Sequence, residues 1–420
     1  MIRDILLLQK REIEQRLRER YVERDFDLGR ISHDLIKVIL GPRRAGKSFF
    51  ALHLMKNLGP FGYVNFDDER LVELGDFDSL IAAIDTLYEH PKYLLIDEVQ
   101  NLTRWELLVN RLQRQGYNLV VTGSNAHLLS SELATHLTGR HMPIVLFPFS
   151  FQEYLRSLNR EQTERETAEA FRNYAEAGGY PEPLIKGIPY REYLTTLMRS
   201  ILYKDIVIRH RIRAPQGLQD LLEYLMTNVA QRYSLNNLVG VTRLRSVQTV
   251  EKYLHYLDEA FLLFSVRRFL FKIRGQLRSN RKIYCTDNGL ITSASFRFSS
   301  NTGKLYENII AVELQRRALA GALEYYYWQN PQQEEVDFVV KEGRKVEQLI
   351  QVCLNIDDPK TKSREVRALI KASEELNCKE LLILTDSTDG QETTSWFGRK
   401  ATIRYLPVWK WLLGANRRSL

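Results

Sequence analysis

The sequence has little cysteine and no long apolar run. Its 420 residues include three cysteines, Cys285, Cys353 and Cys378, which are widely spaced and form no CxxC pair. Neither a disulfide framework nor a zinc site is therefore expected, and we interpret the three side chains as buried thiols. No stretch approaches the ~20 consecutive apolar residues that a transmembrane helix needs, so the sequence predicts no membrane partner.

A secretion signal is also missing. The N-terminal apolar stretch is three leucines long, at 6–8, before the chain becomes charged. A signal peptide needs an apolar region of ~7–15 residues, so we expect a cytoplasmic protein. Internal repeats and low-complexity segments are absent too. Because 420 residues exceed what one core usually holds, two or three domains are expected.

Positive charge is in moderate excess. The formal net charge is +8 and the sequence pI is about 9.2, which suits either a polyanionic partner or an ordinary basic surface. Part of the charge is concentrated in the middle of the chain, at Arg267, Arg268, Lys272, Arg274, Arg278, Arg281 and Lys282.

Short apolar runs alternate with helical patterns in the first third of the chain. Residues 1–24 have helical periodicity with a polar face, and the apolar runs that follow lie at 35–40, 63–66, 93–97, 118–123 and 143–147. Continuous apolar strands separated by helices are typical of a parallel sheet covered on both faces. We therefore predict an α/β domain over 1–150.

The pattern after Pro148 is helical to about residue 260, and short strands return near residue 283. Helices are expected at about 304–320 and 361–377 among these strands. The sequence predicts a helical lid at 151–210, a winged-helix-like segment at 211–278 and a second α/β domain at 279–420.

The segment GPRRAGKS fits the phosphate-binding loop pattern G-x-x-x-x-G-K-[ST], and it follows a predicted strand and precedes a predicted helix. Backbone amides of such a loop cradle phosphates, Lys47 reaches the β and γ oxygens, and Ser48 can bind Mg²⁺. The predicted nucleotide-binding residues are Gly41, Pro42, Arg43, Arg44, Ala45, Gly46, Lys47 and Ser48.

A second signal is YLLIDEVQ, an apolar strand that ends in Asp97 and Glu98. In a chain with a phosphate loop, Asp97 can hold the water shell of Mg²⁺ together with Ser48. Glu98 can orient and deprotonate the attacking water. The sequence therefore predicts ATP hydrolysis rather than nucleotide binding alone.

Two further residues are weaker candidates. Asn125 follows the strand at 118–123, where its side chain could sense the γ-phosphate, although a turn explains the same residues equally well. Arg140 precedes the last strand of the sheet. It could reach the active site of a neighbouring subunit, or it could form a surface ion pair.

These motifs, with YVNFDDERL, GSNAHLLS, PFSFQEYL and GGYPEP, resemble the archaeal-type ATPases of the AAA+ and STAND-related clade over nearly the whole chain. The resemblance implies a five-stranded ATPase core with an extra strand between the phosphate-loop strand and the acidic strand. It also implies ATP as the nucleotide and a homo-oligomer, of which a hexameric ring is one form. A winged helix and a domain resembling the D/ExK nucleases would follow.

The helical middle has the spacing of a helix-turn-helix, with a third helix beginning near Ser246. Its polar face suits contacts with DNA phosphates and grooves, but winged helices also bind proteins or act as lids. The candidate DNA contacts are Arg245, Gln248, Thr249, Lys252, Arg267 and Arg268.

The nuclease-like resemblance places two acids, Glu307 and Asp337, at the expected metal site. An active enzyme would also present Glu-x-Lys on the next strand, but this sequence has Gln351 and Cys353 there. An amide does not supply a carboxylate's charge and a thiol does not supply an ammonium, so we expect a degenerate site without nuclease activity. The sequence thus favours an ATPase that remodels DNA. A nucleotide-dependent switch that binds a protein is the alternative, and an ATP-regulated nuclease is a third.

Overall fold

The computed structural model describes residues 2–26, 35–124, 139–294, 302–396 and 398–415. The chain divides into two compact units. Unit 1 contains Met1–Pro148 and Glu259–Phe261, and unit 2 contains Phe149–Asp258 and Leu262–Leu420.

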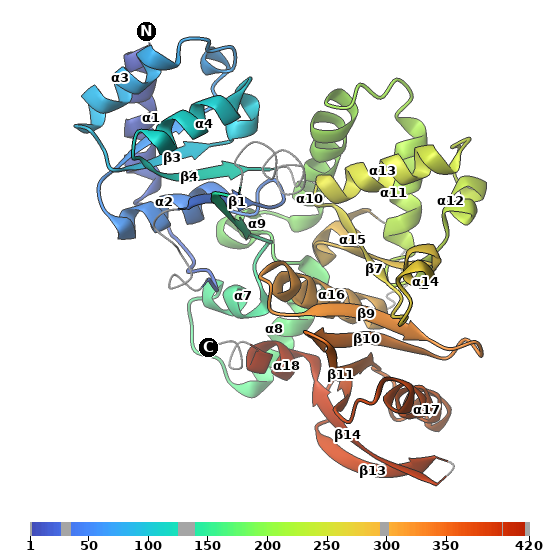
Figure 1. Ribbon diagram of the computed structural model, residues 1–420. Coiled ribbons are helices and arrows are strands. Elements are labelled where there is room, and N and C mark those ends of the chain that lie inside the picture. The colour runs from blue at the N-terminus through green and yellow to red at the C-terminus, as the bar shows by residue number, and fades with distance from the viewer. Residues whose placement is uncertain (1, 27–34, 125–138, 295–301, 397, 416–420) are drawn as a thin grey trace. The chain divides into compact units, whose positions relative to one another are not determined.

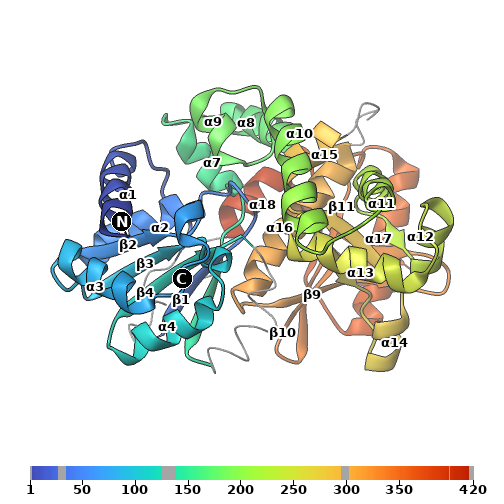
Figure 2. The same cartoon turned by 90° about the horizontal axis from the view of Figure 1, so that it is seen from above.

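Unit 1 is built around a five-stranded parallel sheet of order β2-β3-β4-β1-β5 (Figures 1 and 2). The predicted extra strand is β4, which lies between β1 and β3. The strands are β1 (Ile36–Leu40), β2 (Phe61–Asn65), β3 (Tyr93–Asp97), β4 (Asn118–Gly123) and β5 (His141–Val145). The helices are α1 (Ile2–Arg16), α2 (Lys47–Leu58), η2 (Glu69–Leu71), α3 (Phe77–Tyr88), η3 (Val99–Asn101) and α4 (Trp105–Arg114).

Both faces of this sheet are covered, as the continuous apolar runs predict. Val38 and Leu40 of β1 pack in one core with α3 and α4, whereas Ile39 packs in the other core with α2. The alternation follows from the two-residue period of a strand, which sends successive side chains to opposite faces. The leading helix is shorter than predicted, because α1 ends at Arg16 rather than near residue 24.

Unit 2 begins with helices that carry clear N-terminal caps. Ser150 and Glu153 form a capping box at α7, and Thr163 and Glu166 form another at α8. The helices are α7 (Phe151–Ser157), α8 (Glu164–Ala177), α9 (Pro181–Lys186), α10 (Tyr190–Ser200) and the π-helical η4 (Ile201–Ile208). The helical character predicted for this region is confirmed.

A small three-stranded sheet of order β6-β8-β7 follows, and the helices α11, α12 and α13 precede β7 in the chain. Its elements are α11 (Gln216–Thr227), β6 (Arg232–Tyr233), α12 (Leu235–Val241), α13 (Val247–Glu259), β7 (Leu263–Arg267), α14 (Ile273–Arg278) and β8 (Arg281–Cys285). The boundary expected at residue 278 falls inside this sheet, because β8 pairs with β7 along its whole length.

The last part of unit 2 is a six-stranded mixed sheet of order β13-β14-β12-β11-β10-β9. Its core lies between the sheet and α17, with Leu369 and Leu349 fully buried. The elements are α15 (Asn288–Ala294), α16 (Thr302–Leu319), β9 (Glu324–Gln329), β10 (Glu335–Glu342), β11 (Lys345–Val352), α17 (Pro359–Leu376), β12 (Leu381–Thr385), β13 (Gly390–Trp396), β14 (Arg399–Pro407) and α18 (Val408–Ala415). The predicted α/β character of this region is confirmed. The three cysteines are buried and unpaired, as expected.

Candidate nucleotide-binding site

The phosphate loop connects the carboxyl end of β1 to the first residue of α2, which is Lys47. The loop needs glycine at its start. Gly41 has a φ of 144°, and a Cβ atom there would lie 2.0 Å from the carbonyl oxygen of Leu146. Gly46 has a φ of 92° and Arg44 a φ of 65°, so the backbone turns through left-handed conformations before the helix begins. The loop therefore has the curvature that lets successive backbone amides face an anion.

Lys47 is buried and lies across the inside of this loop. Its Nζ atom donates hydrogen bonds to the carbonyl oxygens of Gly41, at 3.1 Å, and Pro42, at 2.9 Å. These contacts hold the ammonium next to the loop. A phosphate oxygen would be a stronger acceptor than a neutral carbonyl, because it is charged.

The two acids of β3 lie beside the loop, as the sequence predicts. Ser48 donates a hydrogen bond of 3.0 Å from its hydroxyl to Oδ1 of Asp97, and Tyr63 donates one of 3.1 Å to Oδ2. Thr122 of β4 donates to Oδ1 as well. Asp97 is almost completely buried, so burial is the first cause that raises its pKa, and the neighbouring Glu98 is the second.

Glu98 has a different environment from Asp97. Ser124 donates a hydrogen bond of 3.1 Å to its Oε2 atom, and Gln100 donates to the same oxygen. Burial acts to raise the pKa of Glu98, but the charges of Lys47 and Arg43 and these hydrogen bonds outweigh burial and lower it. The pKa values of the two adjacent carboxyl groups are therefore shifted in opposite directions, so Glu98 ionises more readily than Asp97.

The β3-β4 pairing brings these groups together. Because β3 and β4 are parallel, Asp97, Glu98, Thr122 and Ser124 all lie at the carboxyl edge of the sheet, where the phosphate loop also begins. The Glu98 backbone amide donates to the Thr122 hydroxyl at 3.0 Å, which ties the two strand ends together. Glu98 itself has a φ of 50°, a left-handed conformation.

Sequence reasoning missed one residue at the loop, Arg24. It is buried, and its Nη1 atom donates a hydrogen bond of 3.0 Å to the carbonyl oxygen of Ala45. Its Nη2 atom donates to the carbonyl oxygen of Phe147. One guanidinium therefore joins the phosphate loop to the segment after β5. The charged sequence around Arg24 gave no signal of this burial.

Arg140 lies at the other edge of the sheet. It immediately precedes β5, and its carbonyl oxygen accepts a hydrogen bond from Ile36, the first residue of β1. The length of β1 therefore separates Arg140 from the phosphate loop of its own chain. Its side chain is exposed. Asn125 lies outside the described residues.

The candidate DNA-contact residues divide into exposed side chains and side chains that are engaged within unit 2. Arg245, Gln248 and Lys252 are exposed at α13, and Arg267 is exposed at the end of β7. Thr249 is instead half-buried and engaged at the start of α13, where Ser246 Oγ caps the helix by accepting a hydrogen bond of 3.1 Å from the Thr249 backbone amide and lies 2.9 Å from the Thr249 hydroxyl. Arg268 donates to the carbonyl oxygen of Gln329, so this guanidinium is engaged within unit 2.

The sequence places Lys282 in the basic run at 267–282, but its side chain is buried and does not contribute to the surface charge. Its side chain is 2% exposed and contacts Glu307, Glu335 and Asp337. Glu307 and Asp337 are therefore brought together, as the nuclease-like resemblance predicts, but around a lysine. Gln351 lies next to them and accepts a hydrogen bond of 3.1 Å from the Asp337 backbone amide. Burial raises the pKa of the Cys353 thiol to about 11.

Models of known protein families match three parts of the chain. Residues 33–155 match the family model of an AAA domain. Residues 168–301 and 302–410 match two domains of unknown function, DUF8612 and DUF4143. Within the parts of the chain that the structure describes, no helix has the length and apolar content needed to cross a membrane.

Two relatives that match along most of the chain are uncharacterized proteins. One from Methanocaldococcus jannaschii is 31% identical over 413 residues, which cover 93% of this chain and 91% of that protein. One from Haemophilus influenzae is 31% identical over 370 residues, or 83% of this chain and 89% of that protein. A solved Walker-type ATPase of Pyrococcus abyssi is 17% identical over 62% of this chain and 90% of that chain, with a TM-score of 0.42. The AAA-domain match and the similarity along nearly the whole chain show that this protein belongs to the archaeal-type, AAA-like family of P-loop ATPases.

Proposed function

We propose that unit 1 binds ATP with Mg²⁺ and that Glu98 activates the water that attacks the γ-phosphate. The observation that carries this proposal is the hydrogen bond from Ser48 to Asp97, beside the loop lysine and next to Glu98. Ser48 and Asp97 present oxygen atoms, which are the ligands that Mg²⁺ prefers. The donor set therefore fits the cation, which would neutralise charge on the phosphate oxygens.

Each residue then has one task. Lys47 would exchange the carbonyl oxygens of Gly41 and Pro42 for phosphate oxygens. The ionised Glu98 would accept a proton from water, and its hydrogen bonds from Ser124 and Gln100 would hold the carboxylate in orientation. Arg140, which lies away from its own loop, would serve the site of a neighbouring subunit in a homo-oligomer such as a ring of six.

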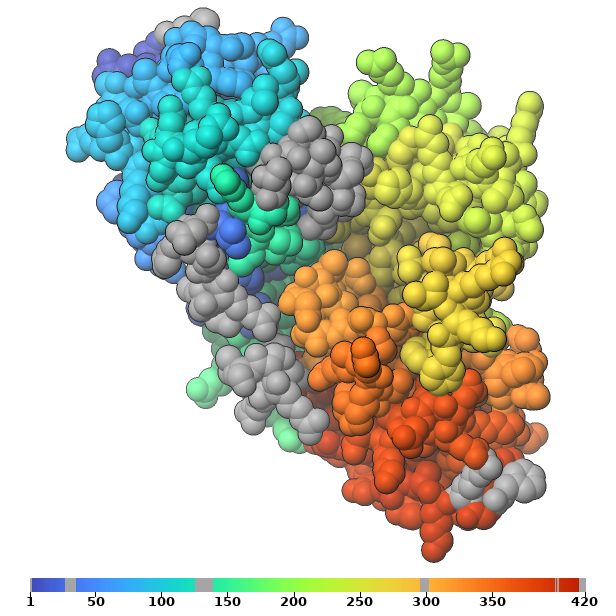
Figure 3. Space-filling model, in the orientation of Figure 1, coloured from blue at the N-terminus to red at the C-terminus, as the bar shows by residue number. Residues whose placement is uncertain are grey.

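We further propose that unit 2 binds DNA. The element order α11-β6-α12-α13-β7-α14-β8 and the sheet order β6-β8-β7 support a winged helix with one extra short helix, α14, and α13 would be its recognition helix. Gln248 and Lys252 of α13 are exposed, as is Arg245 just before this helix. The β7-β8 connection adds exposed cations at Lys272, Arg274 and Arg278, and the gold atoms of Figure 3 show that this connection lies on the surface.

The DNA proposal is tested by the ATPase rate of the full chain with and without duplex, single-stranded and branched DNA. We expect DNA to raise the rate, and we expect the R245A/K252A double variant to lose this stimulation. Because two phosphate contacts would be removed, the slope of log affinity against log salt should fall by about 2. The R344A/K345A variant, which removes two exposed cations of the β10-β11 turn, should keep the stimulation.

A switch that binds a protein partner predicts another result. Such a protein would copurify with nucleotide, hydrolyse it rarely and give the same rate with every DNA. That outcome would contradict the DNA proposal while leaving the nucleotide site in place.

A further inference from the structure

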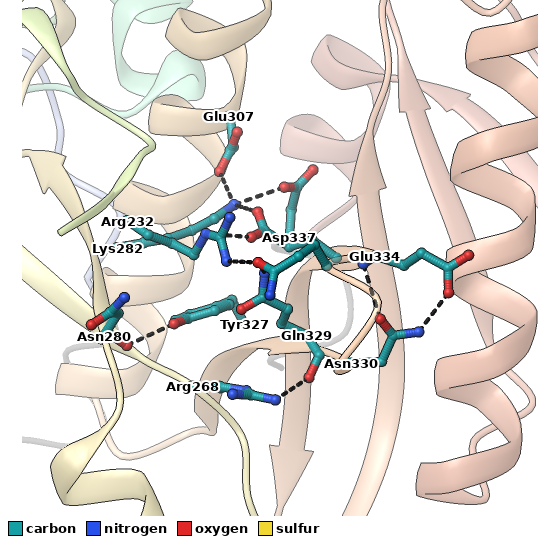
Figure 4. A network of polar contacts seen from close by, with 12 residues as sticks. Arg232, Arg268, Asn280, Lys282, Glu307, Tyr327, Gln329, Asn330, Glu334 and Asp337 are labelled. Carbon is teal, nitrogen blue, oxygen red and sulfur yellow. Dashed lines mark hydrogen bonds and ion pairs between the residues drawn. The ribbon is translucent and has the colours of Figure 1, made fainter. Parts of the chain in front are cut away.

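A buried lysine stands at the centre of the nuclease-like acids. The Nζ atom of Lys282 lies 2.8 Å from Oε1 of Glu307, 2.6 Å from Oε1 of Glu335 and 2.9 Å from Oδ1 of Asp337 (Figure 4). An ammonium group has three N–H bonds, so these three carboxylates satisfy all of its donors. The lysine comes from β8, whereas Glu307 comes from α16 and the other two acids come from β10.

Each of the three acids also has a second partner. Tyr284 donates a hydrogen bond of 2.7 Å to Oε1 of Glu307, the oxygen that Lys282 also contacts, and the backbone amide of Val352 donates one of 3.0 Å to Oδ2 of Asp337. Arg232 of β6 lies 3.3 Å from Oε2 of Glu335. Buried charges are tolerated when they are paired and hydrogen-bonded in this way. Lys282 therefore supplies a cation to all three acids, and each acid has one further partner.

A divalent metal does not fit this arrangement. Mg²⁺ requires oxygen ligands at about 2.0–2.1 Å around a point that here holds an ammonium nitrogen. Gln351, at the position where an active enzyme would have a carboxylate, uses its Oε1 atom for the Asp337 amide and its Nε2 atom for Glu365. In the described part of the chain, no group of three or more His, Cys, Asp or Glu side chains is arranged to hold a metal ion.

We propose that Lys282 is a built-in cation that takes the place of the metal ion, so that the acids form a structural joint and not a nuclease centre. The joint fastens the three-stranded sheet, through β8 and β6, to α16 and to β10 of the six-stranded sheet. A substitution of Lys282 by alanine would leave three carboxylates around an emptied point and would create a site for a divalent cation.

The first test uses Mn²⁺ binding to the full chain, freed of metal with EDTA and followed by electron paramagnetic resonance. The K282A variant should bind one Mn²⁺ ion more than the wild type. The K282A/D337N variant should lose that ion, and since both variants retain the phosphate-loop site, the difference reports the cluster alone. Absence of any extra Mn²⁺ site in a folded K282A variant would contradict the proposal.

The second test is thermal unfolding of unit 2. Removing one partner of a buried ion cluster should lower the Tm of K282A by about 6–10 °C in EDTA, and Mn²⁺ should restore part of the loss. The matched control is K341A, which removes a lysine of β10 from an ion pair with the exposed Glu324. K341A should change the Tm by less than about 2 °C and should not respond to Mn²⁺.

The third test does not depend on the folding of K282A. The wild-type chain and the D337N variant should bind the same number of Mn²⁺ ions. The wild-type chain should also not cleave plasmid DNA in Mn²⁺ or Mg²⁺. Wild-type cleavage that disappears in D337A, or a wild-type Mn²⁺ site that disappears in D337N, would overturn the proposal and would instead support an ATP-regulated nuclease.

Discussion

The hydroxyl of Ser48 donates a hydrogen bond of 3.0 Å to the carboxylate of Asp97, although the two residues are 49 positions apart in the sequence. The contact joins the first turn of α2 to the end of β3, and it places two oxygen ligands for a cation beside Lys47. Glu98, the next residue, is held by Ser124 and Gln100. The proposed base and the proposed cation ligands therefore lie side by side at one edge of the sheet.

The environment of Asp97 makes the stability of unit 1 depend on pH. Burial and Glu98 raise the pKa of Asp97 above its unfolded value. The folded state therefore binds more protons than the unfolded state between the two pKa values, and stability is lost as the pH rises from the unfolded pKa, about 3.9, toward the folded one. We expect the Tm of unit 1 without nucleotide or metal to fall as the pH rises, and D97N to reduce this dependence. An equally steep fall in D97N would show that other groups cause it.

Arg24 should affect nucleotide affinity, although it is not among the residues predicted to contact the phosphates. In R24M the carbonyl oxygens of Ala45 and Phe147 would lose a charged donor, so the loop would be less firmly positioned. We expect the variant to be destabilised by about 2–3 kcal/mol and to bind ATP more weakly. Isothermal titration and chemical unfolding measure the two effects. R18A, which changes an exposed arginine nearby, is the control and should behave as the wild type.

Gly178 should tolerate no side chain. It has a φ of 77°, and a Cβ atom there would lie 1.9 Å from Oδ1 of Asp287, whose carboxylate accepts hydrogen bonds from Gly179 and Gly289. G178A should therefore destabilise unit 2 by more than about 3 kcal/mol. The control is G187A, where φ is 65° but no atom lies within 4 Å. It should cost only the ~1–2 kcal/mol of the left-handed backbone. Equal losses in urea unfolding would show that the clash with Asp287 is unimportant.

The sequence predicted the fold best where the apolar pattern was continuous. In the first sheet β1, β3 and β4 are buried along nearly their whole length, so their runs stood out, and the run of β3 also placed Asp97 and Glu98 at a strand end. The edge strand β5 has only Ile144 buried. The strand β13, GQETTSW, was not predicted, because it pairs only with β14 and most of its side chains are exposed or half-buried. Such an edge strand has no apolar face to give a signal.

The polar residues that sequence reasoning missed are those whose partners are distant in the chain. Arg24 contacts a carbonyl oxygen 123 positions away, and Lys282 contacts acids 25 and 55 positions away. Both residues lie in charged stretches, which are typical of a solvent-exposed surface. Only the topology, which pairs β8 with β7 and places α16 and β10 beside it, shows that Lys282 is buried.

The most direct test of the account is to measure Mg²⁺-dependent ATP hydrolysis and ATP binding side by side for the wild type and E98Q. Because Glu98 is assigned as the base and does not hold the phosphates, E98Q should bind ATP about as tightly as the wild type while its turnover falls by about 100-fold or more. Undiminished turnover in E98Q, or a wild-type protein that binds no adenine nucleotide, would contradict the assignment of this site.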